Sequence, residues 1–180
     1  MLFRSYTGNG GPATSAELDE PGGVAVDAAG NVVIADGGND VVRVVAATSG
    51  TFYGQPMTAG DIYTVAGDGA RGYGGDGGPA TDAELANPAA VAIDSTGNLV
   101  IADEGNNRVR VMAVTSGTFY GQEMTAGFID TVAGNGTAGY AGDGGQATSA
   151  ELASPPDVTV FGGNLLIADK VNNRIREVAG

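Results

Sequence analysis

The chain has 180 residues, with 21 acidic and 8 basic side chains and a formal net charge of −13 at pH 7. This balance makes nucleic acid a poor partner, because a groove for the phosphate backbone needs clustered Lys and Arg. The sequence contains neither His nor Cys, which excludes Ser-His-Asp chemistry, His-ligated zinc, thiolate metal sites and disulfides.

The sequence contains no membrane or targeting signal. No apolar run approaches the roughly 18 residues that suggest a membrane-spanning helix, so we expect no membrane span. Residues 1–5 lack the apolar core of a secretory signal. The compartment stays open, although the acidic balance favours an extracellular or cell-surface setting.

The chain repeats itself at a fixed interval. Ala16-Glu17-Leu18 returns as Ala83-Glu84-Leu85 and as Ala150-Glu151-Leu152, 67 positions later each time. Residues 16–67 and 83–134 are identical at 36 of 52 positions. Repeats of this kind are structural units that bury their apolar faces against one another. We therefore expect one repeat domain over residues 1–180, built from units at about 16–67, 83–134 and 150–180.

The second unit predicts four short antiparallel strands. Residues 90–94 and 99–103 are apolar runs joined by a turn in which Gly97 supplies a positive φ. Residues 104–107 form a second turn before the alternating strand 108–112. A longer connection then leads to a fourth strand at 129–133.

Four-stranded sheets repeated at a fixed period are typical of the blades of a β-propeller. We therefore predict an all-β propeller with three four-stranded antiparallel blades per chain, half of a six-bladed ring. A β-solenoid is the rival fold. The third blade should lack its outermost strand, which gives eleven strands in all, and Glu177 should interrupt its third strand.

The repeated residues resemble the NHL repeat. They include Val24-Ala25-Val26-Asp27, Asn106-Asn107-Arg108-Val109-Arg110, and the third copy's Leu166-Ile167-Ala168-Asp169 and Asn172-Asn173-Arg174-Ile175-Arg176. The passage Gly-Asp-Gly-Gly-Pro-Ala-Thr at residues 75–81 is similar to the inter-blade loops of bacterial NHL-repeat proteins. The first copy departs from the pattern at Asp40-Val41, where the other copies have Asn-Arg.

The resemblance implies six blades in a closed ring, and only three copies are present. Three blades would expose two large apolar faces, which mark association. We expect two chains to complete the ring as a homodimer. The alternative is that the chain is a fragment of a longer propeller polypeptide.

The resemblance also places candidate binding residues on one face, in the loops between blades and between second and third strands. They are Asp36, Asn39, Tyr73, Asp76, Asp103, Asn106, Asn107, Tyr140, Asp143, Asp169 and Asn172. Their oxygens could hold Ca²⁺. Because the same residues recur in every copy, a structural role in the turns is the competing interpretation.

Arg43, Arg110 and Arg176 are expected to pair with an Asp and to cover apolar surface with their stems.

Two aromatic pairs recur in the long connections, where sequences normally drift. They are Phe52-Tyr53 and Phe119-Tyr120. They are either contact residues for a partner or part of a small cluster in which the connection folds onto its own blade.

Two classes of function follow. The first is a non-catalytic interaction or scaffold module that binds itself and a protein or carbohydrate. The second, implied by similar propellers that are lyases and lactonases, is a Ca²⁺-assisted hydrolase or lyase with its site in the central channel. That enzyme would need one acidic cluster unlike its copies in the other blades, so the first class is favoured. We predict no metal site, no other cofactor and no catalytic residue.

Overall fold

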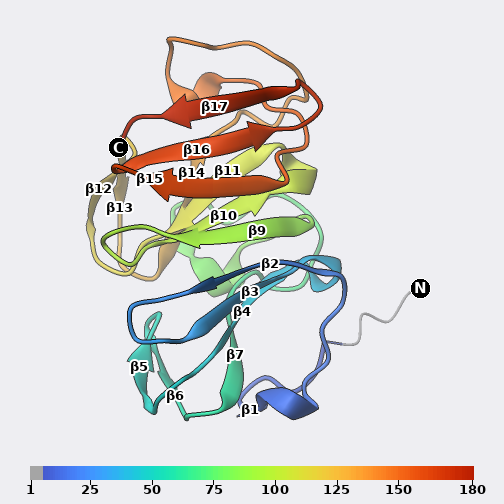
Figure 1. Cartoon of the computed structure of the whole chain (residues 1–180), viewed down its shortest axis with the longest axis vertical. Coiled ribbons are helices and arrows are strands. Elements are labelled where there is room, and N and C mark those ends of the chain that lie inside the picture. Colours follow the sequence, from blue (N-terminus) through green and yellow to red (C-terminus); the bar gives the residue numbers. More distant parts are fainter. Residues whose placement is uncertain (1–5) are drawn as a thin grey trace.

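The computed structural model describes residues 6–180, which form an all-β fold of antiparallel sheets (Figure 1). The expectation about a secretory signal falls on residues 1–5 and lies outside the described residues. In the described part of the chain, no helix is long and apolar enough to cross a membrane.

The first sheet has five strands in the order β1-β7-β4-β3-β2. Its four long strands are those that the first unit predicts. The bounds are β1 (Gly11–Pro12), β2 (Pro21–Val26), β3 (Val32–Asp36), β4 (Val41–Val45) and β7 (Asp61–Ala66).

The second sheet repeats this order as β8-β14-β11-β10-β9. Its strands are β8 (Gly78–Pro79), β9 (Pro88–Ile93), β10 (Leu99–Asp103), β11 (Arg108–Met112) and β14 (Phe128–Ala133). The turn between β9 and β10 has the predicted form: Gly97 has φ +88°, and Asp94 accepts hydrogen bonds from the backbone N–H groups of Thr96 and Asn98 at 2.9 Å.

The expectation of four strands in each of these sheets was wrong, because a fifth strand lies outside the fourth. β1 pairs with β7, and β8 pairs with β14. Both come from the glycine-rich connection that precedes the sheet. A Gly-Pro dipeptide does not resemble a strand, but proline is tolerated at a sheet edge, where its missing N–H breaks no ladder.

The third sheet has three strands, β15 (Asp157–Phe161), β16 (Asn164–Asp169) and β17 (Arg174–Val178). No strand within residues 6–180 pairs with the outer edge of β17, as expected. The prediction that Glu177 interrupts this strand was wrong. Glu177 pairs with Leu166 and its exposed side chain accepts from Asn164, so the charge stays in solvent and the ladder continues.

The eleven predicted strands are all present, and short elements add to them. The long connections contain two hairpins, one of β5 (Gly50–Phe52) and β6 (Gln55–Met57), the other of β12 (Gly117–Phe119) and β13 (Gln122–Met124). The described residues also hold five one-turn 3₁₀ helices: η1 (Ala13–Ser15), η2 (Gly37–Asn39), η3 (Ala80–Asp82), η4 (Glu104–Asn106) and η5 (Ala147–Ser149).

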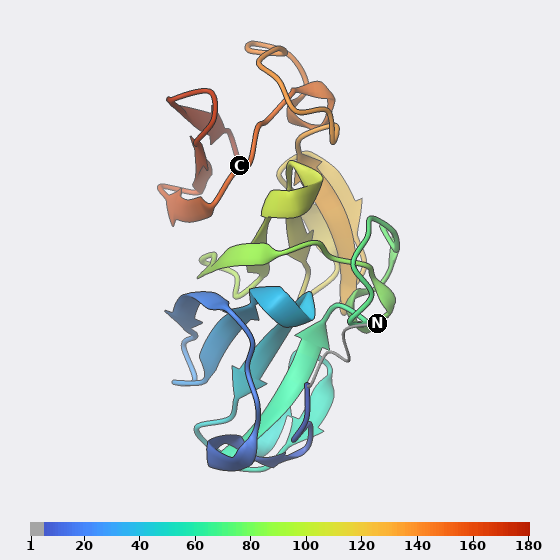
Figure 2. The same ribbon diagram turned by 90° about the vertical axis from the view of Figure 1, so that its right-hand side faces the viewer.

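The three sheets pack face to face in chain order (Figures 1 and 2). One apolar cluster joins the first sheet to the second through residues such as Val33, Val44 and Ile101. Another joins the second sheet to the third through Val100, Val111 and Ile167. β10 therefore contributes to both clusters, which is why its sequence is apolar on both faces.

Candidate functional site

Each sheet carries a buried Asp–Asn–Arg group where its second strand ends. Asp36, Asp103 and Asp169 are completely buried. Each accepts a hydrogen bond from a backbone N–H of the preceding connection, at 2.8 Å in all three copies, from Asp19, Ala86 and Ala153 respectively. The Asp therefore joins the turn to the connection between sheets.

The asparagine of each group completes the same turn. Asn39, Asn106 and Asn172 each donate from Nδ2 to the Asp three positions earlier. The left-handed conformation falls one residue later, at Asp40, Asn107 and Asn173. These asparagines thus have the expected role in the turn, but the positive φ falls on the residue directly after each of them.

Arg110 is fully buried and shows how the group holds a charge inside the sheet. Its Nη1 donates to the carbonyl of Glu84 and its Nη2 to the carbonyl of Gly74, both at 2.8 Å. Nε donates to Asp76 at 3.0 Å, and Asp103 lies 3.8 Å from Nη1. Arg43 and Arg176 make equivalent bonds to Glu17 and Glu151. The expected ion pairs are present in all three copies.

A tyrosine and a carboxylate cover this arginine from outside. The Tyr73 hydroxyl donates to Asp76 at 2.7 Å, and the Arg108 guanidinium stacks 3.5 Å from the centre of the ring. In the third copy, Tyr140 donates to Asp143, and Arg174 stacks at 3.8 Å. Tyr73 and Tyr140 are 43% and 45% exposed, so this outer layer is open to solvent.

The two carboxylates of the second copy have opposite pKa shifts. Burial raises the pKa of Asp103 to about 6. Hydrogen bonds from Asn106 and Ala86 and the charge of Arg110 act in the opposite direction, but they do not cancel the effect of burial. Burial also opposes ionisation of Asp76, but the charge of Arg110 and nearby hydrogen bonds outweigh it, so the pKa of Asp76 is lowered. Each carboxylate has a visible structural cause for its shift.

The first copy is less complete than the other two. Asn9 stands where the second copy has Asp76 and accepts from the backbone N–H of Thr64 at 2.6 Å. Arg43 is fully buried, and its Nε has no hydrogen-bond partner within the described residues. Burial lowers the pKa of Arg43, although the negative charge of Asp36 acts to raise it.

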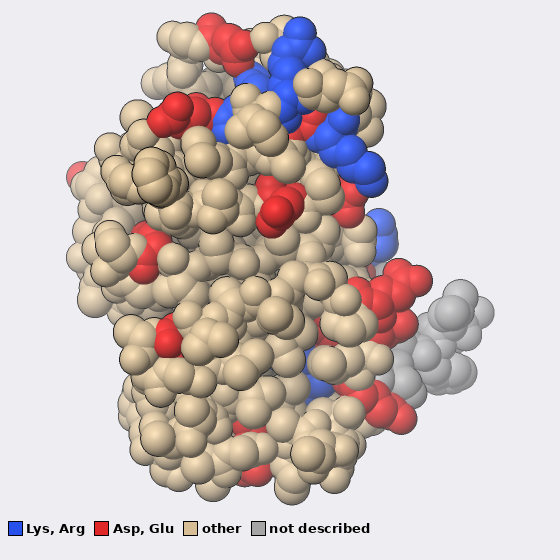
Figure 3. Space-filling model, in the orientation of Figure 1, with Lys and Arg blue, Asp and Glu red and all other residues tan. Residues whose placement is uncertain are grey.

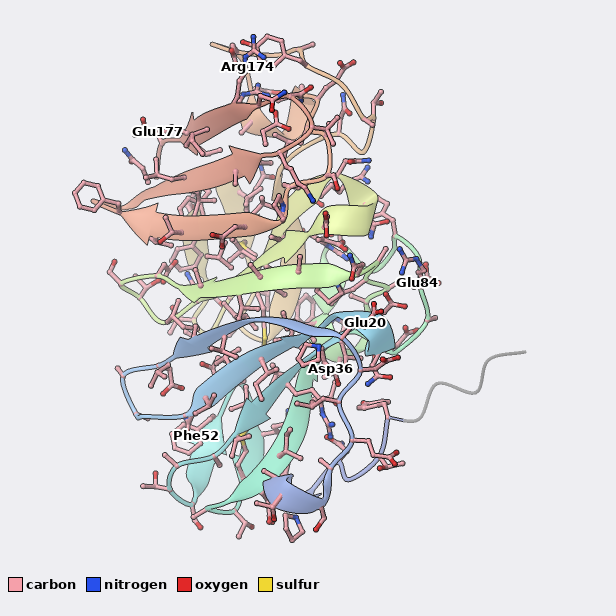
Figure 4. All side chains as sticks on the ribbon, turned by 45° about the vertical axis from the view of Figure 1, so that its right-hand side comes forward. Glu20, Asp36, Phe52, Glu84, Arg174 and Glu177 are labelled. Carbon is pink, nitrogen blue, oxygen red and sulfur yellow. The ribbon has the colours of Figure 1, made fainter. Side chains whose placement is uncertain are left out.

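The aromatic pairs lie against their own sheets. Phe52 and Tyr53 pack on the first cluster, and Phe119 and Tyr120 belong to the second. The Tyr53 hydroxyl donates to Asp27 at 3.0 Å, and Tyr120 donates to Asp94 at 3.2 Å. Figure 4 places Phe52 far from Glu20 and Asp36, which lie together at the opposite edge. Phe52 thus lies apart from Asp36, whereas Tyr120 lines one groove together with the candidate residues Tyr140 and Asp143.

Charge is distributed unevenly over the molecule. On the face seen in Figure 3, Lys and Arg gather at the end where the third sheet lies, the part of the chain that contains Lys170, Arg174 and Arg176. Within residues 6–180, no group of three or more His, Cys, Asp or Glu is placed to hold a metal ion.

Sequence reasoning missed three contributors to these groups. Arg108 and Arg174 stack on the tyrosines, and Asn98 is completely buried between Asp94 and the N–H of Val114. The repeat carried a signal for each of them, because Asn-Arg follows the turn in two copies and Gly-Asn stands at the turn into the second strand in all three. The sequence did not identify the tyrosine on which each arginine stacks, because that tyrosine lies more than thirty positions earlier, in the preceding connection.

Repeated antiparallel sheets that pack face to face in chain order define an all-β protein of the β-propeller class. The match to a known repeat is more specific: residues 85–112 fit the family model of the NHL repeat. The chain therefore carries an NHL repeat, and the resemblance drawn from its sequence is confirmed.

Three of the solved structures with a similar fold come from Bacteroides species. A protein of unknown function from Bacteroides thetaiotaomicron superposes with a TM-score of 0.69 at 20% identity, over 99% of this chain and 37% of that protein. Two others are described as auxiliary nutrient binding proteins. The one from B. thetaiotaomicron has a TM-score of 0.62 at 20% identity, and the one from B. ovatus 0.57 at 17%. Each match covers 87% of this chain and 36% of that protein.

The chain thus spans little more than a third of the length of these structural relatives, and at this identity the likeness shows the fold alone. A comparison with curated proteins found no match.

Proposed function

We propose that the chain is a non-catalytic binding and scaffold module whose ring is completed by a second copy. In this proposal, residues 1–180 form one repeat domain with blades at about 16–67, 83–134 and 150–180. The observation that carries it is the pair of sheet faces left uncovered at the two ends of the stack.

The uncovered face of the first sheet is apolar. Val24 and Val26 are 67% and 64% exposed. The equivalent residues of the second sheet, Val91 and Ile93, pack against the first sheet. The same apolar face is buried in the second repeat and exposed in the first, so a further sheet packed on the first would cover it.

The uncovered face of the third sheet is more mixed. Ile175 is 72% exposed, and its equivalent Val109 is fully buried between the second and third sheets. Thr159 and Glu177, however, stand where the second sheet has Ala92 and Val111. A contact between this face and the first sheet of another copy would therefore be the weakest contact in the ring.

A repeated hydrogen bond supports the same pairing. Asn87 donates its backbone N–H to Asp40 at 2.7 Å, and Ser154 donates equivalently to Asn107 at 2.8 Å, each across a sheet-to-sheet contact. The next members of this series are Asn173 in the third sheet and Glu20 before the first, both exposed. In a ring of two chains, the Glu20 N–H of one copy would donate to Asn173 of the other.

Solution mass tests this proposal. Sedimentation at micromolar concentration should give twice the chain mass of 17.7 kDa, and Val24→Asp should restore the monomer by placing a charge in the apolar contact. The control is Thr51→Asp, which adds the same charge to an exposed hairpin residue away from both end faces. A wild-type monomer at this concentration would contradict ring closure and favour the alternative, a piece of a longer propeller.

For the ligand we propose a protein or a carbohydrate, as the descriptions of two structural relatives as nutrient binding proteins suggest. The exposed Tyr73–Arg108 and Tyr140–Arg174 stacks would form its contact surface, together with Asp76 and Asp143. Loss of ligand binding on Tyr73→Ala, with the fold retained, is the expected result of a glycan- or peptide-array screen.

One observation bears on the enzyme alternative. Asp130 lies near Asp76 in the second copy, and burial together with the Asp76 charge raises the pKa of Asp130. The first copy has Tyr63 and Asn9 at these positions, so the acidic pair is specific to one sheet. It lies on the fourth strand, however, away from the first strands, which would line a central channel. Calorimetric titration with Ca²⁺ distinguishes the two classes: one tightly bound ion per ring would favour the enzyme.

A further inference from the structure

The connection after β14 carries one of the two Asn-Gly steps in the sequence, Asn135-Gly136; the other is Asn9-Gly10. An asparagine followed by glycine is prone to lose its side-chain amide, because glycine has no Cβ to shield its nitrogen from the side-chain carbonyl. The reaction needs a glycine N–H that can give up its proton and a side chain held close to that nitrogen. These two requirements distinguish the steps.

The Asn9-Gly10 step is held by the first sheet. The Gly10 N–H donates to the carbonyl of Ile62 at 2.8 Å, so its nitrogen is engaged with β7. The Asn9 side chain is anchored on the same strand, because its Oδ1 accepts from the backbone N–H of Thr64 at 2.6 Å. Both reacting groups of this step have other partners, and we expect the step to react slowly.

The Asn135-Gly136 step is arranged differently. Asn135 is exposed, and its Oδ1 accepts from the backbone N–H of Thr137 at 2.8 Å, a contact that holds the side chain against the backbone of Gly136. The Gly136 N–H donates no hydrogen bond within residues 6–180. The Thr137 N–H is also placed to stabilise the negative charge that develops on Oδ1 when a nitrogen attacks the amide carbon.

Arg108 favours the ionised form of the attacking nitrogen. Its Nη2 donates to the carbonyl oxygen of Asn135 at 2.7 Å, and that oxygen belongs to the same peptide group as the Gly136 nitrogen. Resonance places the negative charge of the deprotonated peptide group on this oxygen, where a bonded guanidinium stabilises it. The carbonyl of Asn106 and the ring of Tyr73 hold the guanidinium in place.

We propose that Asn135 is a self-modifying site, which the chain converts to aspartate and isoaspartate with acceleration by Arg108. The Gly136 nitrogen loses its proton to solvent base and attacks Cγ of Asn135, so that an N–Cγ bond forms and the Cγ–Nδ2 bond breaks. The departing nitrogen takes up a proton and leaves as ammonia, which produces a cyclic imide. Water then adds to either imide carbonyl and opens the ring, leaving one new carboxylate.

The first sheet supports the fit of the aspartyl product. Asp68-Gly69 stands at the equivalent position of that repeat. The Asp68 Oδ1 accepts from the backbone N–H of Ala70 at 2.7 Å, as Asn135 does from Thr137. An aspartate at position 135 would therefore keep the turn.

The modification would add a negative charge beside the Tyr73–Arg108 stack. Asn135 lines a shallow hollow of about 320 Å³ together with these two residues. In the isoaspartyl product, the oxygen that Arg108 contacts would belong to a free carboxylate instead of a peptide group. The reaction itself depends neither on ring closure nor on the proposed ligand.

The test follows both Asn-Gly steps in the wild-type chain during incubation in warm, mildly alkaline buffer. Peptide mapping by mass spectrometry and chromatography separates asparagine, aspartate and isoaspartate at each step. We expect the amide of Asn135 to be lost at least about tenfold faster than that of Asn9. Amide hydrogen exchange is a second readout, because base-catalysed exchange passes through the same ionised peptide group. Gly136 should exchange faster than Gly10.

A matched pair of variants isolates the effect of the guanidinium. Arg108→Gln keeps a neutral donor but removes the charge, so amide loss at Asn135 and hydrogen exchange at Gly136 should both slow about tenfold. The control Lys170→Gln removes the same charge from an exposed turn and should change neither rate. A merely structural role of Arg108 predicts the opposite, because a loosened connection would not slow exchange.

Three results would overturn the proposal: amide loss at Asn135 no faster than at Asn9, equal amide loss in wild type and Arg108→Gln, or faster exchange of Gly136 in that variant. If Arg108→Gln loses its circular dichroism signal, the wild-type comparison decides, and Gly136 exchange no faster than Gly10 exchange then contradicts the proposal. These measurements use no ligand and do not measure association, so failure here is distinguishable from failure of the proposed function.

Discussion

At the residue scale, the three buried arginines differ in how fully their guanidinium groups are bonded. Arg110 donates from Nε, Nη1 and Nη2, whereas Nε of Arg43 has no partner within the described residues. The difference follows from one position, Asn9 against Asp76. A buried donor without an acceptor costs more than a formed bond contributes, so the first sheet should be the less stable of the two.

The first prediction exchanges these residues. Asn9→Asp should stabilise the chain by about 1–2 kcal/mol, because it supplies a second carboxylate that can accept from the Nε of Arg43, unpartnered within residues 6–180. Asp76→Asn should destabilise it by about the same amount. Urea unfolding at pH 7 measures both. If both changes destabilise the chain, a carboxylate at position 9 does not bond Arg43 as Asp76 bonds Arg110, and the prediction is wrong.

The second prediction concerns Asp103, whose pKa burial raises to about 6. Because the folded state holds this proton more tightly than the unfolded state, the contribution of Asp103 to stability is full below about pH 4 and falls as the pH rises through 6. The pH-dependent change amounts to about 3 kcal/mol. The measurement is the free energy of unfolding of the wild type and of Asp103→Asn between pH 4 and 7.5. As the pH rises, the wild type should lose stability relative to Asp103→Asn, because only the wild type then carries a buried charge at this position. A constant difference across this range would contradict the shift.

At the element scale, the sequence predicted the parts that repeat and are long. The eleven predicted strands, the Gly97 turn and the pairing of Arg110 with an Asp all follow from apolar alternation and the 67-residue interval. The sequence could not predict β1 and β8, because two-residue strands have no periodicity and exist only where another strand offers an edge. It also misplaced the end of β17, since a charge on one face does not interrupt a strand whose face is open to solvent.

The candidate site was predictable only in part, for a related reason. Asp103 and Asn106 are three positions apart, so their contact is local and could be read from the sequence. The Tyr73–Arg108 stack and the Arg110–Asp76 bond join residues more than thirty positions apart. Only the register of the folded connection brings them together.

The third prediction concerns the hairpin of β12 and β13. Tyr120 is 9% exposed and donates to Asp94, and burial together with the Asp94 charge raises the pKa of its hydroxyl. Tyr120→Ala should lower stability by about 3 kcal/mol, as the loss of a buried aromatic side chain does. Phe119→Ala should act in the same direction. Thermal unfolding measures both, with the exposed Thr118→Ala as the control. Unchanged melting of both aromatic variants would favour a partner-contact role instead.

At the scale of the whole molecule, the proposed ring closure would have to overcome electrostatic repulsion between the two copies. Each chain carries a net charge of −13, so two copies would repel each other at long range. The outer face of the third sheet would also add the polar Thr159 and Glu177 to the proposed contact. Apolar contact between Val24, Val26 and Ile175 would have to outweigh that repulsion.

The fourth prediction is therefore that salt strengthens the proposed dimer. Screening should raise the association constant as NaCl increases from about 0.05 to 0.5 M, because the Debye length then falls from above 10 Å to a few ångströms. Sedimentation velocity across this range measures the change. Dissociation at high salt would mean that ion pairs rather than apolar faces hold the copies together.

The edge strands β1 and β8 also bear on how the chain folds. Gly78 pairs with Ile129, 51 positions later, so the second sheet acquires its outermost strand from residues synthesised before any of its others. Each of the first two sheets must wait for its last long strand before the first segment can dock, and closing a loop of that length is entropically slow. We expect the glycine-rich connections to gain protection from hydrogen exchange late in folding, one sheet at a time from the N-terminus.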